Sequence, residues 1–372
     1  MYAFLSHTSA LDVLRTIDNG GRELTPWPSE ARELPRHYNS VTTQRMFKQF
    51  ASEYDLAEYG ITRTPVDLLV PKASQRTRGA AAHFHVWKGR IPSNSMLRLD
   101  KFLFVSTPEF VLLQMAGWHS KTDPIIDNFA RELDAIRGIS PVTSPDGTIS
   151  PISYDNPFTW DKAQRLVGLT LVAMELMGTY RLSPPGGATR YKQQPLLSFA
   201  SMEQFMQRVG RTYGRNRLCA SLALAGLHSA SPMETALYLM LCLPELYGGY
   251  GLPRPKLNRE IPVQNHERLW TGGASITPDL LWPNINLVIE YDSDEMHGNA
   301  GPLKLARDAM RANVLSTLGY TVLRVTTRNI QSPVDVERLA HQIAVKLGMQ
   351  LEDPSKELHI RRGKLHALLM RQ

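Results

Sequence analysis

The sequence has few of the features that identify secreted, membrane or nucleotide-binding proteins. Of its 372 residues only two are cysteines, Cys219 and Cys242, so no disulfide framework is expected, and no Cys/His spacing matches a zinc site. The N-terminus lacks the basic start and apolar core of a signal peptide, and no apolar run reaches the roughly 18 residues of a membrane span. Neither a glycine-rich phosphate loop nor an internal repeat is found. These absences favour a cytoplasmic protein.

Length and charge suggest several domains and a polyanionic partner. A chain of 372 residues with 42% hydrophobic residues is long enough for two cores. Residues 231–350 contain eleven Lys and Arg against twelve Asp and Glu, whereas the rest contains 31 against 23, within a net charge of +7. The predicted segments are an N-terminal α/β domain (1–140), a helical connector with a basic patch (141–230, starting with the turn-rich 141–157), a catalytic domain (231–350) and a basic tail (351–372). A basic excess outside the catalytic domain is typical of elements that hold nucleic acid.

The most informative stretch is 276–299, which is apolar except for spaced acids. Two strands are predicted about a turn at Pro283-Asn284, with Asp279 on the first and Glu290 and Asp292 on the second. Residues two apart share one face of a strand, and an antiparallel pair would bring Asp279 onto that face. Three converging carboxylates would repel one another unless a cation lay between them, and oxygen ligands suit Mg²⁺ or Mn²⁺. The alternative is that these acids lie at solvated strand ends.

The surrounding segments predict the order helix, three strands, helix, strand, helix. An apolar helix over 232–246 carries Glu234 near its start, and a first strand is predicted over 257–264. After the acidic strand come an amphipathic helix over 302–320 that ends at Gly319, a strand over 321–327, and a helix opened by Pro333.

This order and its motifs resemble the PD-(D/E)xK nuclease fold, and most closely the bacterial nuclease domains related to very-short-patch-repair endonucleases. The motifs are an apolar run ending in Glu290-x-Asp292, His297, Asp308 with Arg311, the tripeptide LGY at 318–320, and Arg324 in the following strand. The resemblance covers roughly residues 231–348 and implies a restriction-endonuclease-like core with hydrolase activity. The chain departs from the usual pattern where Asp292 takes the place of the lysine.

The resemblance and the chemistry of phosphodiester hydrolysis suggest a role for each candidate residue. Asp279 and Glu290 are expected to bind the metal, Asp292 to hold a second ion or orient the water, and Glu234 to complete the site. His297 is a candidate general base or acid because its pKa lies near neutral pH, or else an exposed loop residue. Asp308 and Arg311, three apart on one helix, are expected to pair locally or to face the site.

The N-terminal segment is weakly similar to the part of the abortive-infection antitoxin family that lies outside its winged helix. A capped helix at 6–15, strands at 65–71 and 81–89, and a helix within 104–116 are predicted. His83 and His85 lie on one face of their strand, where they are candidates to bind metal or phosphate or are ordinary polar residues. The family's winged helix is absent from the sequence, so its repressor role is not implied.

Basic residues of the connector and the tail are candidates for nucleic-acid contacts. Four arginines cluster around Tyr213, namely Arg208, Arg211, Arg215 and Arg217. Such a group suits a phosphate backbone, and a solvated helix face is the equal alternative. The tail carries further arginines suited to a DNA clamp or an oligomer contact.

The sequence therefore predicts an α/β protein with a restriction-endonuclease-like core, a separate N-terminal α/β domain and a helical connector. The expected activity is that of a Mg²⁺- or Mn²⁺-dependent endonuclease acting on nucleic acid, with DNA preferred, in bacterial defence or genome maintenance. A toxin or another defence component is a candidate partner. The alternatives are an antitoxin-like regulator that binds nucleic acid through a non-cleaving nuclease fold, and a structural interaction protein.

Overall fold

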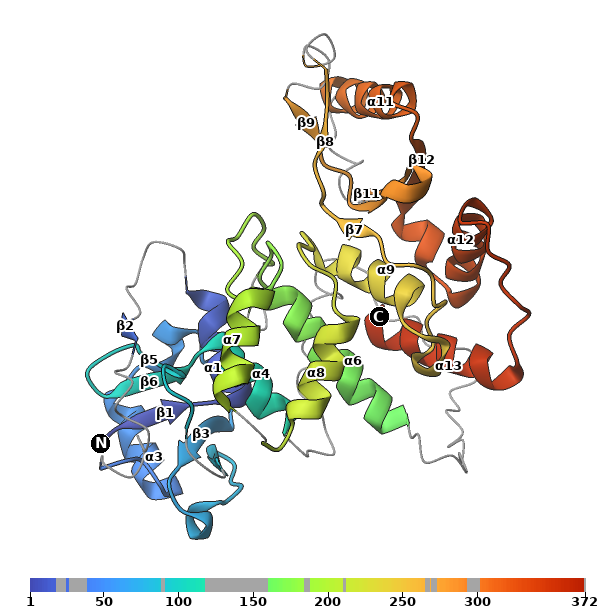
Figure 1. The fold of residues 1–372 in the computed structure, drawn as a ribbon. Helices are drawn as coiled ribbons and strands as arrows, with labels where there is room; N and C mark the ends of the chain where they lie inside the picture. Colours follow the sequence, from blue (N-terminus) through green and yellow to red (C-terminus); the bar gives the residue numbers. More distant parts are fainter. Residues whose placement is uncertain are drawn as a thin grey trace. The chain divides into compact units, whose positions relative to one another are not determined.

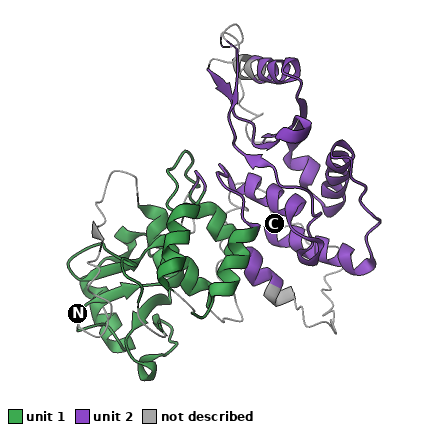
Figure 2. Cartoon of the chain, viewed as in Figure 1, with its two compact units in different colours: residues 1–128, 168–177, 181–223 green, residues 129–167, 178–180, 224–372 purple. Residues whose placement is uncertain are grey.

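The chain folds into two compact units, each with its own β-sheet. The computed structural model describes residues 1–17, 25–26, 39–87, 91–117, 160–183, 188–209, 212–264, 268, 273–292 and 302–370. Unit 1 comprises residues 1–128, 168–177 and 181–223, and unit 2 comprises 129–167, 178–180 and 224–372 (Figure 2). The protein is thus mixed α/β, as predicted. The turn-rich segment 141–157 lies outside the described residues.

Unit 1 is built on a mixed six-stranded sheet in the order β2-β5-β6-β1-β3-β4. Its strands are β1 (Ala3–Leu5), β2 (Thr25–Pro26), β3 (Val66–Val70), β4 (Ala82–Val86), β5 (Met96–Arg98) and β6 (Leu103–Ser106). Strand β1 runs parallel to β6 and antiparallel to β3, and β3 runs parallel to β4. The strands predicted near residues 65–71 and 81–89 are confirmed as β3 and β4.

The helices of this unit are α1 (His7–Thr16), α3 (Gln44–Glu53), α4 (Pro108–Ala116), α6 (Trp160–Leu176, partly in unit 2), α7 (Phe199–Val209) and α8 (Arg215–Leu224). Helix α7 lies beside α4 (Figure 1). Helix α1 packs on α4, β3 and β6. Its N-cap is Ser6, as the sequence predicts, but no side-chain cap hydrogen bond forms. The Ser6 hydroxyl instead contacts His7 Nδ1 at 3.0 Å.

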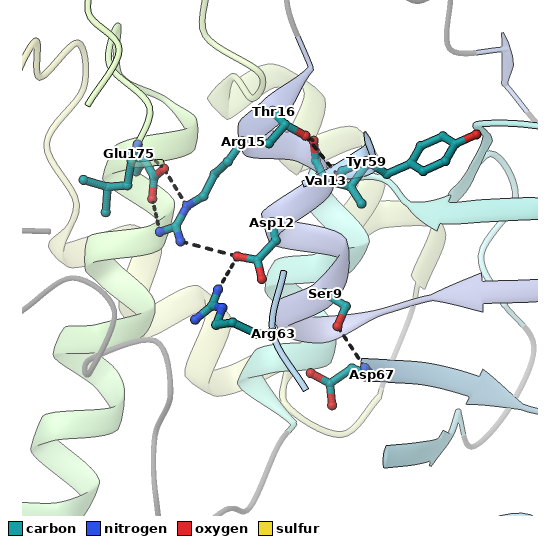
Figure 3. Close-up of polar contacts among 10 residues, drawn as sticks. Ser9, Asp12, Val13, Arg15, Thr16, Tyr59, Arg63, Asp67 and Glu175 are labelled. Atoms are coloured by element: carbon teal, nitrogen blue, oxygen red, sulfur yellow. Dashed lines mark hydrogen bonds and ion pairs between the residues drawn. The ribbon is translucent and has the colours of Figure 1, made fainter. Parts of the chain in front are cut away.

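Buried charges fix the position of α1 (Figure 3). Arg15 donates to both carboxylate oxygens of Glu175 in α6, at 2.9 and 2.6 Å. Asp12, one turn before Arg15 on α1, forms an ion pair with Arg63. Burial raises the pKa of Asp12, and the two arginines oppose that rise. Because leaving either charge of such a pair alone in the interior would be costly, this network holds α1 in one position.

Unit 2 contains a four-stranded sheet in the order β12-β11-β10-β7. The strands are β7 (Lys256–Leu257), β10 (Leu280–Trp282), β11 (Leu287–Asp292) and β12 (Thr321–Thr326). Strands β7, β10 and β11 are antiparallel neighbours, and β12 is parallel to β11. The turn predicted at Pro283-Asn284 is confirmed as a short 3-10 helix, Pro283–Ile285.

The helices of unit 2 follow the predicted order. They are α9 (Pro232–Cys242), α11 (Pro302–Thr317), α12 (Pro333–Lys346) and α13 (Lys356–Leu369). Helix α11 connects the parallel strands β11 and β12, and Gly319 follows it with a left-handed φ of 84°. Among the described residues, no helix has both the length and the hydrophobicity required to cross a bilayer.

The prediction of one continuous strand over 257–264 is wrong. Strand β7 ends at Leu257, and Asn258 takes a left-handed φ of 47°, which takes the chain out of the extended conformation. A second short strand, β8 (Ile261–Pro262), pairs instead with β9 (Ser275–Ile276) as a separate two-stranded ribbon. Ile261 and Ile276 of this ribbon belong to a buried cluster with Val314 and Leu315 of α11.

The basic tail forms a helix that packs on unit 2. Helix α13 contacts α9 and α12. Its Arg362 is buried, pairs with Glu337 at 2.9 Å, and lies 4.0 Å from the centre of the Tyr250 ring. Arg362 is therefore a packing residue of unit 2, whereas its neighbour Arg361 pairs locally with Glu357.

Candidate functional site

The strand pair β10–β11 brings two of the predicted acids together. Leu280 is paired with Ile289, so Asp279, one residue before β10, lies next to Glu290 across the pair. The main-chain N–H of Tyr291 donates to Asp279 Oδ2 at 2.6 Å. The antiparallel arrangement predicted for these acids is therefore confirmed, and this bond holds Asp279 at the end of the strand pair that lies opposite the turn.

Glu290 pairs with an arginine from the crossover helix. Arg311 Nη2 of α11 donates to Glu290 Oε1 at 3.1 Å and to the carbonyl oxygen of Thr277 at 3.2 Å. Of the two arrangements expected for Arg311, the one that faces the site is observed. The carbonyl oxygen of Asp308 accepts a hydrogen bond from Arg324 Nη2 at 2.8 Å, which ties α11 to β12.

Glu234 reaches the same region from the first turn of α9. Its side chain is buried, and its Oε2 accepts hydrogen bonds from Asn258 Nδ2 at 2.6 Å and from the main-chain N–H of Ala230 at 2.8 Å. Ser231, three residues earlier, caps the helix by accepting from the N–H of Glu234. The spacing of Ser231 and Glu234 is that of a capping box, but the Glu234 carboxylate accepts from the N–H of Ala230, one residue before the N-cap, and not from that of Ser231.

The charges of these acids interact. Burial and then the negative charge of Glu234 raise the pKa of Asp279 to about 8, with a further contribution from Glu290. The hydrogen bond from Tyr291 and the charge of Arg311 oppose this rise. Burial also raises the pKa of Glu234. The site therefore holds more negative charge than its surroundings stabilise, which is the condition that a bound cation relieves.

The structure says less about the other two predicted site residues, Asp292 and His297. Asp292, half-buried, ends β11 two residues after Glu290 and is paired with Thr326 of β12. His297 lies outside the described residues. The donors of the described acids are all oxygens, which fits Mg²⁺ or Mn²⁺. However, among the described residues the ligand atoms that all lie within 4.8 Å of one another belong to a group in unit 1, and these acids do not form such a group. The acids of unit 2 are therefore farther apart than the ligands of a closed metal shell.

Two of the four predicted nucleic-acid-binding arginines hold helix ends. Arg215 Nη1 donates to the carbonyl oxygen of Met206 at 2.6 Å, and Arg217 Nη1 donates to that of Ala116 at 2.5 Å. These bonds connect α8 to the last turns of α7 and α4, where carbonyl groups lack helical partners. Arg208 is exposed on α7, and Arg211 lies outside the described residues.

A second polar site lies in unit 1, and the sequence indicated two of its three residues. His83 and His85 lie beside Asp67 of β3, and the ligand atoms of the three all lie within 4.8 Å of one another. Burial alone would raise the pKa of Asp67, but hydrogen bonds with both histidines hold it well below its usual range. The missed signal was the single charged residue in the apolar run VDLLV, because a charge in such a strand needs a partner.

Comparisons with known proteins give no activity for the chain. Two uncharacterized proteins of Mycobacterium tuberculosis, from strains CDC 1551 and H37Rv, are each 31% identical to it over 139 residues. The match covers 37% of this chain and 45% of each relative, so it spans less than half the length of those proteins. Neither a protein-family model nor a solved structure matches the chain.

Proposed function

We propose that unit 2 is a metal-dependent endonuclease domain of the PD-(D/E)xK type. It would hydrolyse phosphodiester bonds, with DNA as the preferred substrate, in bacterial defence or genome maintenance. The observation that carries this proposal is the burial of Asp279 near Glu234 and Glu290: burial first, then the negative charge of Glu234 and that of Glu290, raise the pKa of Asp279 to about 8. A protein that only binds a polyanion gains nothing from burying such acids together.

The topology of unit 2 supports the same proposal. Helix α9 precedes three antiparallel strands, β7, β10 and β11, and the crossover helix α11 returns the chain to β12, parallel to β11. This is the order expected of a restriction-endonuclease-like core. Asp279 directly precedes β10, and Glu290 lies in the second half of β11.

The proposed roles follow from the contacts. Asp279 and Glu290 would hold Mg²⁺ or Mn²⁺ with Glu234 beside them, and the bound ion would supply a polarised phosphate and an activated water. Arg311 neutralises Glu290 and fixes its direction through the bond to Thr277. Asp292 would orient the water, and His297 would accept or return a proton.

One observation favours a non-cleaving regulator instead. Glu290 already has a cation partner in Arg311, and Glu234 already has two hydrogen-bond donors from the protein. Both acids are therefore partly compensated without a metal. The second candidate is an antitoxin-like protein that binds nucleic acid through this fold.

Cleavage of supercoiled plasmid separates the two candidates. The purified chain should nick DNA with Mg²⁺ or Mn²⁺ and not with a chelator present. Asp279→Asn and Glu290→Gln should abolish nicking, because each removes a metal ligand. Glu352→Gln, which alters an exposed acid, is the matched control and should cleave like the parent. Equal cleavage by all three variants, or none by the parent on DNA or RNA, would end the nuclease proposal.

A further inference from the structure

The edge of the sheet in unit 1 gathers three metal-ligating side chains on one face. Asp67 of β3 is paired directly with His83 of the parallel edge strand β4. His85, two residues farther along β4, points to the same side of the strand as His83. Register alone therefore fixes the grouping of these three residues.

The distances between these side chains suit a small ion. Asp67 Oδ1 lies 2.7 Å from His85 Nε2 and 3.6 Å from His83 Nδ1. Ligands at about 2.0–2.1 Å around a tetrahedral ion are about 3.3 Å apart. To bind such an ion, the separation of Asp67 from His85 must increase and that of Asp67 from His83 must decrease, each by well under about 1 Å. Rotation of the side chains can supply these shifts.

The cluster has a graded exposure. The side chain of Asp67 is 4% exposed, that of His85 15% and that of His83 26%. The carboxylate thus lies deepest and the imidazoles lead towards the surface, so an ion can reach the site without unfolding the sheet. Three protein ligands also leave at least one coordination position for water.

Residues of helix α1 contact the cluster. Ser9 Oγ accepts a hydrogen bond from the main-chain N–H of Asp67 at 2.9 Å (Figure 3). The His7 ring stacks on His85, with 3.9 Å between ring centroids and 26° between planes. His7 also holds a left-handed φ of 47°, a conformation that costs a non-glycine residue of the order of 1 kcal/mol or more and that concentrates at functional sites.

We propose that Asp67, His83 and His85 form a binding site for a divalent transition-metal ion of the zinc class. Two imidazoles and one carboxylate are a donor set typical of such ions, whereas Mg²⁺ and Ca²⁺ prefer oxygen alone. The site is separate from the acids of unit 2 and does not depend on the nuclease proposal. The competing explanation is that the histidines only tie β4 to β3 by hydrogen bonds.

The test measures zinc binding by the full chain after treatment with a chelator. The experiment uses the Asp279→Asn/Glu290→Gln double variant as parent, so that the acids of unit 2 do not contribute. Isothermal titration calorimetry with Zn²⁺ should show one ion per chain, and Co²⁺ should give the visible absorption of a low-coordinate site. His83→Gln and Asp67→Asn should each weaken binding by about 100-fold or more, beyond the 10–100-fold typical of losing an outer partner. His359→Gln, an exposed histidine of α13, should bind like the parent.

Two results would overturn the site. One is equal zinc affinity in the parent and in His83→Gln. The other is no zinc binding by the folded parent at micromolar concentration, which would leave the strand tie as the role of these side chains. Because Asp67 is buried, its variant needs a thermal melt to show that it folds. His83→Gln alters the most exposed ligand and decides the question if Asp67→Asn does not fold.

Discussion

Replacing Asp279 by asparagine should stabilise unit 2 at alkaline pH in the absence of metal. In the folded chain burial and the nearby acids raise the pKa of this carboxyl to about 8, from an ordinary value of 3.8. Between these pH values the folded state binds a proton that the unfolded state has released, so stability falls as pH rises through this window. Asparagine removes that titration and keeps an acceptor for the N–H of Tyr291.

The size of the effect follows from the shift. About four pH units at about 1.4 kcal/mol each give an upper limit of roughly 6 kcal/mol. Because Glu234 titrates together with Asp279, we expect about half of this, roughly 3 kcal/mol. For a unit of this size each kcal/mol corresponds to about 2–4 °C in Tm, so the difference should be about 6–12 °C.

Thermal melts at pH 5 and pH 8.5 in a chelator measure this difference. Because the loss of stability begins near pH 3.8, Asp279→Asn should melt only slightly above the parent at pH 5 and well above it at pH 8.5. Adding Mg²⁺ at pH 8.5 should raise the Tm of the parent and not that of the variant. Asp353→Asn, at an exposed acid, is the control. The reasoning is refuted if the gap between Asp279→Asn and the parent is the same at both pH values.

Two further predictions concern the arginines and the histidine. Arg217→Ala should lower stability by about 1–3 kcal/mol, because the Ala116 carbonyl loses a charged donor, and chemical denaturation measures the loss. If Arg217 instead contacts phosphate, the variant should keep its stability. The slope of log binding affinity against log salt concentration should then decrease in magnitude by about one. His297→Ala should reduce turnover in the plasmid assay by about 10²–10⁴-fold at unchanged metal affinity. Normal turnover in that variant would leave water activation to the metal alone.

The local pattern of unit 2 was predictable because each element carries its own signal. Alternating apolar residues, Pro283-Asn284 at the turn and Gly319 after α11 are all readable within a few residues. The break after Leu257 was not, since nothing in the sequence shows that Asn258 turns to bind Glu234.

The polar contacts depended on tertiary structure. Arg311 and Glu290 are 21 residues apart and meet only because α11 crosses back over the strands. Asp67 and His85 are 18 residues apart and meet only through the parallel register of β3 and β4. Arg215 and Arg217 were predicted from composition, which cannot distinguish a phosphate contact from a bond to a helix carbonyl.

The packing of α13 links the end of the chain to the candidate site. Helix α13 contacts α9, and α9 carries Glu234 at its start. Arg362 holds α13 in place through Glu337 and the Tyr250 ring. A chain cut after residue 350 would therefore lose the helix that supports α9, even though every proposed metal ligand remained. The folding unit that contains the candidate site therefore extends to about residue 369, beyond the boundary at residue 350 that the sequence motifs predict.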